Sequence, residues 1–463
     1  MAKTQPARGM RDFLPADVRR REYVIGRIKE VYERYGFEPL ETPAVENIET
    51  LSGKYGEEGS QLIFKILKRG VHESTGAADL ALRYDLTVPL ARVVAEYRAS
   101  LPKFFKRYQI QPVWRADRPA HGRFREFYQC DVDALGSRSM LVEAELCAAA
   151  CDALKQLGFN NFTMRLNHRQ VLTGVLDAAG VSIEQQSDAL VALDKLDKIG
   201  REGVSGELGE RGIAAEAGER LLSFFESLAA LEHAAELTDD SITTTPAALN
   251  AATLGRLVEF VGDHEAGARG IDELRSVVQL AAATPAGAHI RIDPSLARGL
   301  SYYTGAIMEI KVPDLAGSLG GGGRYDNLVG MFSGQDVPAC GFSLGLERII
   351  VVMTEREMFP QALMGAAADV MVTIWNEEAV GEALALAAEL RGAGLRVDVY
   401  PEADKLGKQF KYASSRGIPF VVVMGETERE RGEVALKDMT TGEQQTLARA
   451  SVAEAVREKL KRS

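Results

Sequence analysis

The sequence has few cysteines and no long apolar segment, and each of these features excludes a class of protein. Four cysteines occur in the chain, and none forms a Cys-x-x-Cys pair or lies beside a plausible set of zinc-binding histidines. We therefore expect small buried thiols. No run of about 18 apolar residues occurs, so no membrane span is expected.

The amino terminus also lacks the apolar stretch of a secretory signal. Together with reduced thiols, this favours the cytoplasm. The net charge of −11 argues against a general nucleic-acid binder, because phosphate contacts need lysine and arginine. Residues 103–125 are an exception, with seven Lys/Arg and one acidic residue, Asp117. This segment is the first candidate to bind a polyanion.

Patterns in the first third of the chain predict a helix followed by an antiparallel sheet. Apolar residues at near-helical spacing predict a helix over residues 16–36. Pro43 interrupts the next strand, which places that strand at an edge or an interface. Residues 104–135 contain strand-like runs without an intervening helix, and consecutive strands favour an antiparallel sheet.

Later changes in composition predict the domain organisation. Residues 169–285 are rich in Ala, Leu, Glu and Asp with helical periodicity, which predicts a helical insertion. The insertion splits one domain into residues 1–168 and 286–360. Residues 366–463 alternate strands with helices and predict a small α/β domain with a parallel core. The expected fold class is α/β, of the α+β kind.

The first candidate site is a hairpin that begins at Arg115 and continues through Arg123, Arg125 and Glu126. Residues near a hairpin turn lie close together, so several guanidinium groups can converge on one polyanion. Arginine suits phosphate because its planar fork donates two charge-assisted hydrogen bonds. A solvated surface hairpin is the alternative.

Two glycine-rich segments form the second group of candidates. Arg348 follows Gly341 and Gly345 at the start of a predicted helix, where the helix dipole does not favour a cation. This position indicates a bound anion, or else an ordinary helix start with a surface arginine. The glycines at 320–323 lack the phosphate-loop pattern. We expect them to form a crowded backbone turn at a ligand pocket.

Two short segments suggest contacts to a small polar ligand. Asp85 and Thr87 are two residues apart, so in a strand both side chains project from one face and suit an ammonium group. Tyr302 and Tyr303 are adjacent, so in a strand they face opposite sides, one toward the core and one toward a pocket. A strand-end turn and two core tyrosines are the alternatives.

The order of these segments resembles class II aminoacyl-tRNA synthetases. Pro43, the Arg115 hairpin and the Gly341–Arg348 segment match motifs 1, 2 and 3 of that class. Residues 291–305 and 321–330 resemble the two signatures of histidyl-tRNA synthetases. The segments NHRQVL, LDKLDKIG and LGKQFKYASSRGIPFVVVMG resemble the same family, and the resemblance extends over residues 5–463.

This resemblance implies a fold and a reaction. The fold is an antiparallel sheet flanked by helices, with a helical insertion and a C-terminal α/β anticodon-binding domain. The activity is ATP-dependent conversion of histidine to histidyl-adenylate, followed by transfer to the 3′ end of tRNA(His). ATP, Mg²⁺ bridging the phosphates, histidine and tRNA(His) are the implied ligands. A homodimer through motif 1 and no membrane association are also implied.

The resemblance also implies roles for residues around ATP. Arg115 is expected to hold the α-phosphate and Arg348 the γ-phosphate, while Arg123 assists ATP binding. Glu126 is expected to contact the adenine side or a metal ion. Arg298 is expected to be the catalytic arginine between the histidine carboxylate and the α-phosphate.

A second set of residues is implied to bind histidine. Asp85, Thr87 and Gln129 are expected to hold the α-amino group. Asp133 and Tyr303 are expected to contact the imidazole, with Tyr302 beside them in the histidine site. A carboxylate that faces a ring N–H also gives discrimination, because a competing side chain leaves it unpaired at a cost of about 1–3 kcal/mol or more.

Some positions depart from the commonest bacterial pattern and resemble a eukaryotic-like branch. Asp85 and Asp133 stand where many bacterial members have Glu, and Ser301 stands where Asp is usual. These departures concern the part of the family pattern that reads the acceptor end of tRNA, including the extra 5′ guanosine. Two alternatives remain: the histidine-sensing regulatory subunit of ATP phosphoribosyltransferase, and a synthetase for another amino acid.

Overall fold

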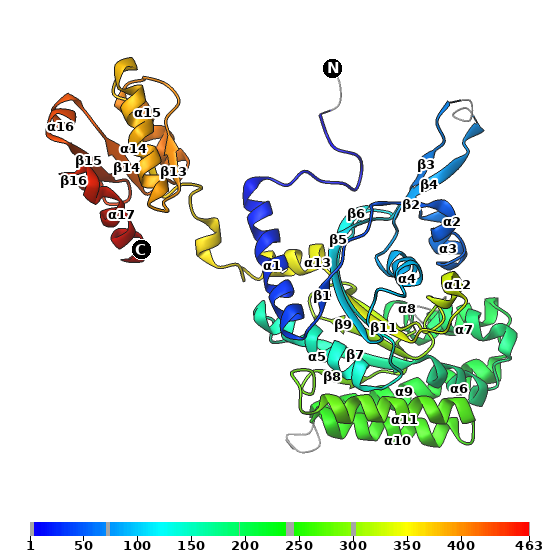
Figure 1. Cartoon of the computed structure of the whole chain (residues 1–463). Helices are drawn as coiled ribbons and strands as arrows, with labels where there is room; N and C mark the ends of the chain where they lie inside the picture. Colours follow the sequence, from blue (N-terminus) through cyan, green and yellow to red (C-terminus); the bar gives the residue numbers. More distant parts are fainter. Residues whose placement is uncertain (1–3, 71–74, 194, 238–244, 298–301, 463) are drawn as a thin grey trace. The chain divides into compact units, whose positions relative to one another are not determined.

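The structure is a computed structural model that describes residues 4–70, 75–193, 195–237, 245–297 and 302–462. The chain forms two compact units, Met1–Phe359 and Pro360–Ser463 (Figure 1). Each unit has its own sheet and its own apolar core. We describe the two units separately.

An eight-stranded sheet forms the centre of the first unit. Its inner neighbours pair antiparallel, while β1 with β5 at one edge and β7 with β8 at the other pair parallel. The predicted antiparallel sheet is therefore confirmed. In spatial order the strands are β1 (Glu38–Pro39), β5 (Phe105–Trp114), β6 (Glu126–Leu135), β11 (Ala339–Gly345), β10 (Ser318–Arg324), β9 (Ala306–Lys311), β7 (Thr163–His168) and β8 (Ile290–Ile292).

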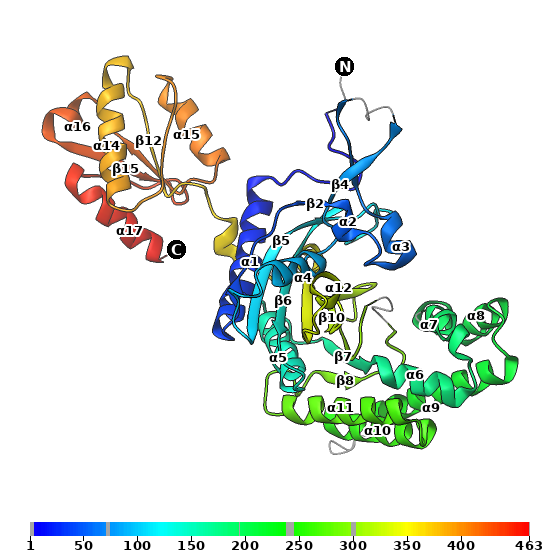
Figure 2. The same ribbon diagram turned by 45° about the vertical axis from the view of Figure 1, so that its right-hand side comes forward.

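Three helices cover one face of this sheet: α1 (Pro15–Arg34), α5 (Leu141–Gln156) and α13 (Leu346–Glu355). Figure 1 labels all three, and Figure 2 shows α1 and α5 from a second side. Strand β6 shows how the two faces differ. Cys130 and Val132 are fully buried in the core that these helices share with the sheet. Because side chains alternate along a strand, the polar residues between them are directed to the opposite face.

A separate, three-stranded sheet begins shortly after β1 in the chain. Its strands are β2 (Val45–Asn47), β4 (Ala78–Leu82) and β3 (Lys65–Leu67), in that spatial order. Pro43 falls between the edge strand β1 and the three-residue strand β2, as its missing N–H requires. The short helices around this sheet are α2 (Ile48–Leu51), α3 (Gly56–Gln61), α4 (Thr87–Glu96) and α12 (Gly330–Ser333).

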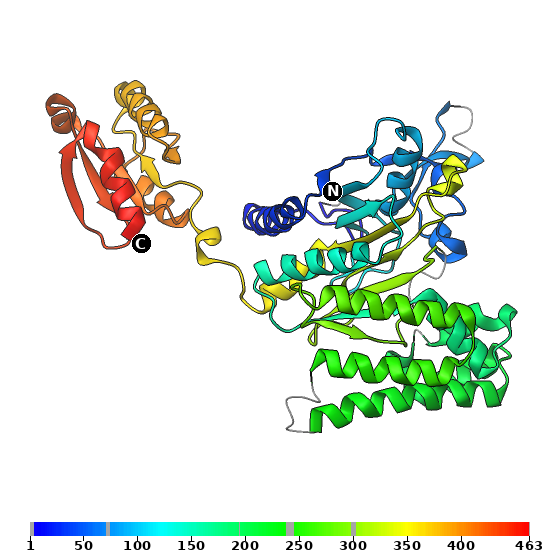
Figure 3. The same cartoon turned by 60° about the horizontal axis from the view of Figure 1, so that its bottom comes forward.

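The described residues between 169 and 285 form helices and no strand, as the sequence predicted. Helix α11 packs against α5 and β7, so the helical segment shares one continuous core with the sheet (Figure 3). His168 caps the first of these helices and bonds to Glu273 at 2.8 Å. The helices are α6 (Arg169–Ala179), η2 (Ile183–Gln185), α7 (Gln186–Leu193), α8 (Leu196–Glu210), α9 (Ala215–Leu237), α10 (Pro246–Val261) and α11 (Glu265–Ala281).

The second unit contains a five-stranded sheet. Strands β13 (Val397–Val399), β12 (Val370–Val372) and β14 (Phe420–Val423) pair parallel, which confirms the predicted parallel core. Strands β15 (Glu433–Asp438) and β16 (Gln444–Ala448) extend the sheet antiparallel. Its helices are η3 (Gln361–Met364), η4 (Glu377–Ala379), α14 (Val380–Gly392), α15 (Leu406–Ser415), α16 (Glu426–Arg431), η5 (Arg449–Ser451) and α17 (Val452–Arg462).

Two further expectations were that no segment spans a membrane and that the cysteines are buried thiols. Among the helices that the structure describes, none combines the length and the apolar character needed to cross a membrane. Cys130, Cys147, Cys151 and Cys340 are all buried and unpaired, as predicted. Burial raises the pKa of each of these thiols, which keeps them protonated.

Candidate active site

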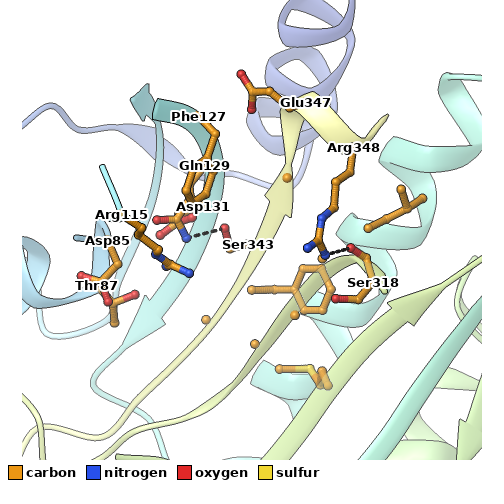
Figure 4. A pocket seen from close by; sticks show the side chains of 18 of the residues that line it. Asp85, Thr87, Arg115, Phe127, Gln129, Asp131, Ser318, Ser343, Glu347 and Arg348 are labelled. Carbon is orange, nitrogen blue, oxygen red and sulfur yellow. Dashed lines mark hydrogen bonds between the residues drawn. The ribbon is translucent and has the colours of Figure 1, made fainter. Parts of the chain in front are cut away.

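A cavity of about 410 Å³ opens in the first unit, on the face of the sheet that α1, α5 and α13 leave uncovered. This volume is in the range of small-molecule sites. The β5–β6 hairpin forms one side, and β10 with the start of α13 forms the other (Figure 4). Most of the predicted site residues line it, namely Asp85, Thr87, Arg115, Arg123, Gln129, Asp133, Tyr302, Tyr303 and Arg348.

One described residue of the predicted site, Glu126, is not brought into this cavity. Glu126 is not among the lining residues, whereas its neighbour Phe127 is, because adjacent side chains of β6 are directed to opposite faces. The predicted contact of Glu126 with adenine or a metal ion therefore has no support from the position of its side chain. Arg298 lies outside the described residues.

The charged lining residues fall into two sets of opposite sign. We call Arg115, Arg123 and Arg348 the arginine end and Asp85, Asp131 and Asp133 the acidic end; the names denote the sign of charge, since Arg115 lies beside Asp85. Figure 4 shows the side chains of Arg115 and Arg348 directed into the same space from opposite sides.

Arg115 is the first residue after β5, where the hairpin closes. Its backbone N–H donates to the carbonyl of Arg125 at 2.9 Å. Its Nε donates to the carbonyl of Tyr84 at 3.1 Å, and its guanidinium lies 4.2 Å from the ring centre of Tyr84 and 5.2 Å from that of Phe127. These contacts fix the direction of the cation before any ligand arrives.

Arg123 is held by a carboxylate of its own loop. Its Nε and Nη2 donate to Asp117 at 3.1 and 2.8 Å, while Nε of Arg125 donates to the Asp117 carbonyl at 3.0 Å. The side chain of Arg123 remains 53% exposed. Three arginines therefore gather at the hairpin as predicted, but Asp117 already neutralises part of their charge.

Arg348 lies in the first turn of α13 and connects two segments. Its Nη1 donates to the carbonyl of Ser318 at 2.5 Å, and its Nε lies 3.4 Å from the carbonyl of Gly122 in the hairpin loop. These two contacts are to neutral carbonyls, so they fix the direction of the guanidinium. The cation is held at a helix start where the dipole disfavours it, which suits a site for an anion.

Asp85 and Thr87 reach the cavity from a turn and a helix start rather than from a strand. The predicted strand ends at Leu82, and Thr87 is the first residue of α4, so the idea of a shared strand face was wrong. The turn before the helix brings both side chains to the cavity instead. Asp85 accepts from Tyr55 Oη at 2.8 Å and from the Val88 N–H at 3.1 Å; burial raises its pKa, and these bonds oppose the rise.

Asp133 is buried, and two side chains hold it. Tyr325 donates its hydroxyl hydrogen to Oδ1, and Nη2 of Arg107 lies 2.9 Å from Oδ2. The carboxylate leans over Gly341 on the adjacent strand, where an added Cβ would lie 1.8 Å from Oδ1. Gly341 is therefore required by the close approach of this side chain.

The two tyrosines and the glycine run also depart from the predictions. Tyr302 and Tyr303 precede β9 in a non-strand segment, so both line the cavity, with ring centres 4.8 Å apart, rather than facing opposite sides. Gly320–Gly323 lie in strand β10, not in a turn. An added Cβ at Gly322 would lie 2.1 Å from the Gly341 carbonyl, so contact with the neighbouring strand explains the glycine.

The lining residues that the sequence interpretation missed include Phe127, Asp131, Tyr325 and Glu347. Strand alternation from Gln129 and Asp133 would have identified Phe127 and Asp131. Glu347 accepts from Arg21 at 2.8 Å and from the Tyr128 N–H at 2.9 Å, contacts that only the folded chain brings together.

Comparison with known families agrees with this geometry. The family model described as histidyl-tRNA synthetase matches residues 9–349, and the anticodon binding domain model matches residues 369–459. The histidine–tRNA ligase of Porphyromonas gingivalis is 42% identical over 465 residues, covering 96% of this chain and 97% of the relative. That of Gloeobacter violaceus is 41% identical and covers 98% of both.

Solved structures give the same result. The histidyl-tRNA synthetase of Nostoc sp. PCC 7120 superposes with a TM-score of 0.78 at 32% identity, over 99% of this chain and 100% of that one. A Bacillus halodurans structure described as an ATP phosphoribosyltransferase regulatory subunit/histidyl-tRNA synthetase gives 0.71 at 21% identity over 91% of this chain and 98% of that one, and shares the fold. The resemblance seen in the sequence is confirmed, and the chain belongs to the histidyl-tRNA synthetase family.

Proposed function

We propose that the chain acts as a histidine–tRNA ligase and that this cavity is where histidine and ATP react. The observation that carries the proposal is one cavity lined both by guanidinium groups and by buried carboxylates. The two ends match the two substrates, since ATP is a polyanion and histidine carries an ammonium group and an imidazole.

The arginine end supports the nucleotide chemistry. An oxygen of the histidine carboxylate attacks the α-phosphorus, the new O–P bond forms, and the bond to the β-phosphate breaks to release pyrophosphate. This step needs little proton transfer and much charge neutralisation, so fixed cations dominate catalysis. Arg115 holds the α-phosphate, Arg348 holds the γ-phosphate, and Arg123 assists ATP binding.

The acidic end supports the binding of histidine. Asp85, Thr87 and Gln129 hold the α-ammonium group, and Gln129 is itself oriented by a 3.0 Å bond from its Nε2 to Ser343. Asp133 and Tyr303 contact the imidazole, with Tyr302 packed beside them. Arg298 acts between the histidine carboxylate and the α-phosphate; this assignment rests on the sequence signature alone.

Mg²⁺ is proposed to arrive with ATP and to bridge its phosphates. Over the described part of the chain, no group of three or more His, Cys, Asp or Glu side chains is arranged to hold a metal ion. Asp117 is paired with Arg123, and Glu347 is paired with Arg21. The residues present do not fit a metal held by the protein, and we derive no step through one.

A homodimer is proposed through the small sheet β2–β4–β3. Val45, Leu67 and Leu80 expose large apolar side chains there, at 38%, 52% and 36% of their surface. Exposed large apolar side chains on one small sheet suit a protein interface. We expect sedimentation equilibrium to give twice the chain mass, and a Leu67→Asp variant to shift the protein toward monomer; a monomeric native chain would contradict the proposal.

A cytoplasmic location is also proposed, supported by four buried, unpaired thiols. A regulatory subunit that senses histidine without catalysis is the second candidate. The arginines at the cavity and the match of residues 369–459 to the anticodon binding domain favour the ligase over it.

Exchange of labelled pyrophosphate into ATP tests the function. We expect exchange with histidine and none with any other standard amino acid. Binding of histidine without exchange would support the regulatory candidate, and exchange driven by another amino acid would overturn the substrate. Arg298→Ala is expected to slow adenylate formation far more than it weakens histidine binding; equal losses would remove its proposed catalytic role.

A further inference from the structure

Asn167 is a fully buried amide outside the cavity lining, and the proposed function gives it no role. It lies on β7, one residue before the end of the strand. Its Nδ2 donates to the carbonyl of Pro294 at 3.1 Å and to that of Leu296 at 2.9 Å. Its Oδ1 accepts from the N–H of His168 at 2.8 Å. Both hydrogens and the oxygen of the amide are therefore used.

The two carbonyls belong to a turn formed by residues 293–297, which follow β8. The N–H of Leu296 donates to the carbonyl of Asp293 at 3.1 Å, and the side chains of Leu296 and Ala297 are each 3% exposed. Buried backbone carbonyls need a donor from elsewhere in the chain, and Asn167 supplies it. Arg298, the proposed catalytic arginine, follows Ala297 directly in the sequence.

Arg165 holds the same turn from the same strand. Arg165 and Asn167 are two residues apart on β7, so their side chains are directed to one face. Nε of Arg165 donates to Oδ2 of Asp293 at 2.5 Å, and its Nη2 donates to Oγ of Ser295 at 3.2 Å. Arg165 thus binds side chains of the turn, whereas Asn167 binds its backbone carbonyls.

We propose that Asn167 is a positioning residue for Arg298. By holding two carbonyls of the turn that leads into Arg298, it sets where the guanidinium group meets the histidine carboxylate and the α-phosphate. This inference rests on the proposed function and extends it to a residue that does not line the cavity.

The expected consequence of losing Asn167 is a loss of rate rather than of affinity. Arg298 is proposed to act where charge develops in the transition state, so its position matters most during the reaction. A displacement of about 1 Å in such a group costs about 100-fold in rate. Asn167 itself lies outside the cavity lining, so the binding of histidine should stay near its native strength.

Steady-state pyrophosphate exchange by the full chain tests the inference. Asn167→Leu removes the three hydrogen bonds and keeps a side chain of similar size. We expect kcat to fall about 100-fold and the KM for histidine to change less than about twofold. In the Arg298→Ala background the same substitution should lower kcat by less than about threefold more, because the group that Asn167 positions is already gone.

Asn250→Leu is the matched control. Asn250 lies on α10 and is 3% exposed; its Nδ2 donates to the carbonyl of Ile290 at 3.1 Å, and its Oδ1 accepts from the N–H of Ile292 at 2.8 Å. It holds strand β8 with the same kind of buried amide contacts. Its loss should lower the melting temperature about as much as Asn167→Leu does, while kcat stays within about threefold of the native value.

If Asn167→Leu fails to fold, Asn167→Asp carries the same test, because a carboxylate of the same shape lacks the two amide donors. An unchanged kcat, or equal losses of kcat in the Asn167 and Asn250 variants, would overturn the inference. So would a second loss of about 100-fold in the Arg298→Ala background, which would show that the two residues act independently. Native-like exchange by Arg298→Ala would remove the role of Arg298 and this inference with it, whereas absence of exchange by the native chain would contradict the proposed function.

Discussion

The two ends of the cavity hold their charges in different ways. At the arginine end, Arg115 and Arg348 donate to neutral backbone carbonyls and face the cavity from opposite sides. At the acidic end, Asp131 and Asp133 are buried against Arg107, which is itself fully buried. The backbone contacts orient the guanidinium groups of Arg115 and Arg348, whereas Asp131 and Asp133 share a buried cation.

This difference follows from the two substrates. ATP brings several negative charges, so uncompensated cations are useful where it binds. Histidine differs from other amino acids in a small ring, so discrimination needs buried polar groups that a wrong side chain leaves unpaired. The comparison predicts catalytic losses from changes at one end, and losses of stability and selectivity at the other.

The largest expected effect is on catalysis at the arginine end. Arg115→Ala should lower the rate of histidine-dependent pyrophosphate exchange by about 1,000-fold, because a preorganised cation that meets the α-phosphate is lost. Arg118→Ala is the control, since Arg118 is exposed in the same loop and does not line the cavity. It should change the rate less than about twofold. Similar losses in both variants would show a general effect of charge.

The largest effect on stability is expected at the acidic end. Arg107→Met leaves two buried carboxylates without their cation, and should lower the free energy of unfolding by about 3–5 kcal/mol. Arg123→Ala removes a half-exposed pair with Asp117 and should cost less than about 1 kcal/mol. Urea denaturation of both variants measures the difference. Equal losses of unfolding free energy in the two variants would mean that the two ion pairs contribute equally to stability, which would contradict the comparison.

An intermediate effect is expected from Gly341→Ala. The added methyl group occupies the position of Asp133 Oδ1 and displaces the carboxylate from the ring. The KM for histidine should rise about tenfold or more, since a charged hydrogen bond is lost, while the KM for ATP changes little. Gly26→Ala in α1, where an added Cβ meets no atom within 4 Å, is the control. An equal rise in both KM values would refute a local effect.

The smallest effect is expected from Arg123→Ala on catalysis. Asp117 neutralises part of its charge, and its side chain is half exposed. The KM for ATP should rise about threefold to tenfold, with little change in the KM for histidine. Steady-state exchange kinetics separate the two. A loss as large as that of Arg115→Ala would place Arg123 in direct contact with the reacting phosphates.

Particular residues show how much of the site could be predicted from the sequence. Arg115, Gln129 and Asp133 could be assigned because their motif order and strand alternation are both readable in the chain. Arg107 could not, since its contact with Asp133 depends on the register between β5 and β6, which the hairpin sets. Tyr302 and Asp85 were placed in strands, but the chain turns at both points, and tertiary packing rather than local pattern decides this.

A crystal structure with histidinol and ATP tests the central claim most directly, because histidinol lacks the carboxylate and cannot react. We expect both ligands in this cavity, with Arg115 on the α-phosphate and the imidazole against Asp133 and Tyr303. Nucleotide bound elsewhere, such as at Arg220 and Arg256 between α9 and α10, would contradict the account. So would an imidazole directed away from the acidic end.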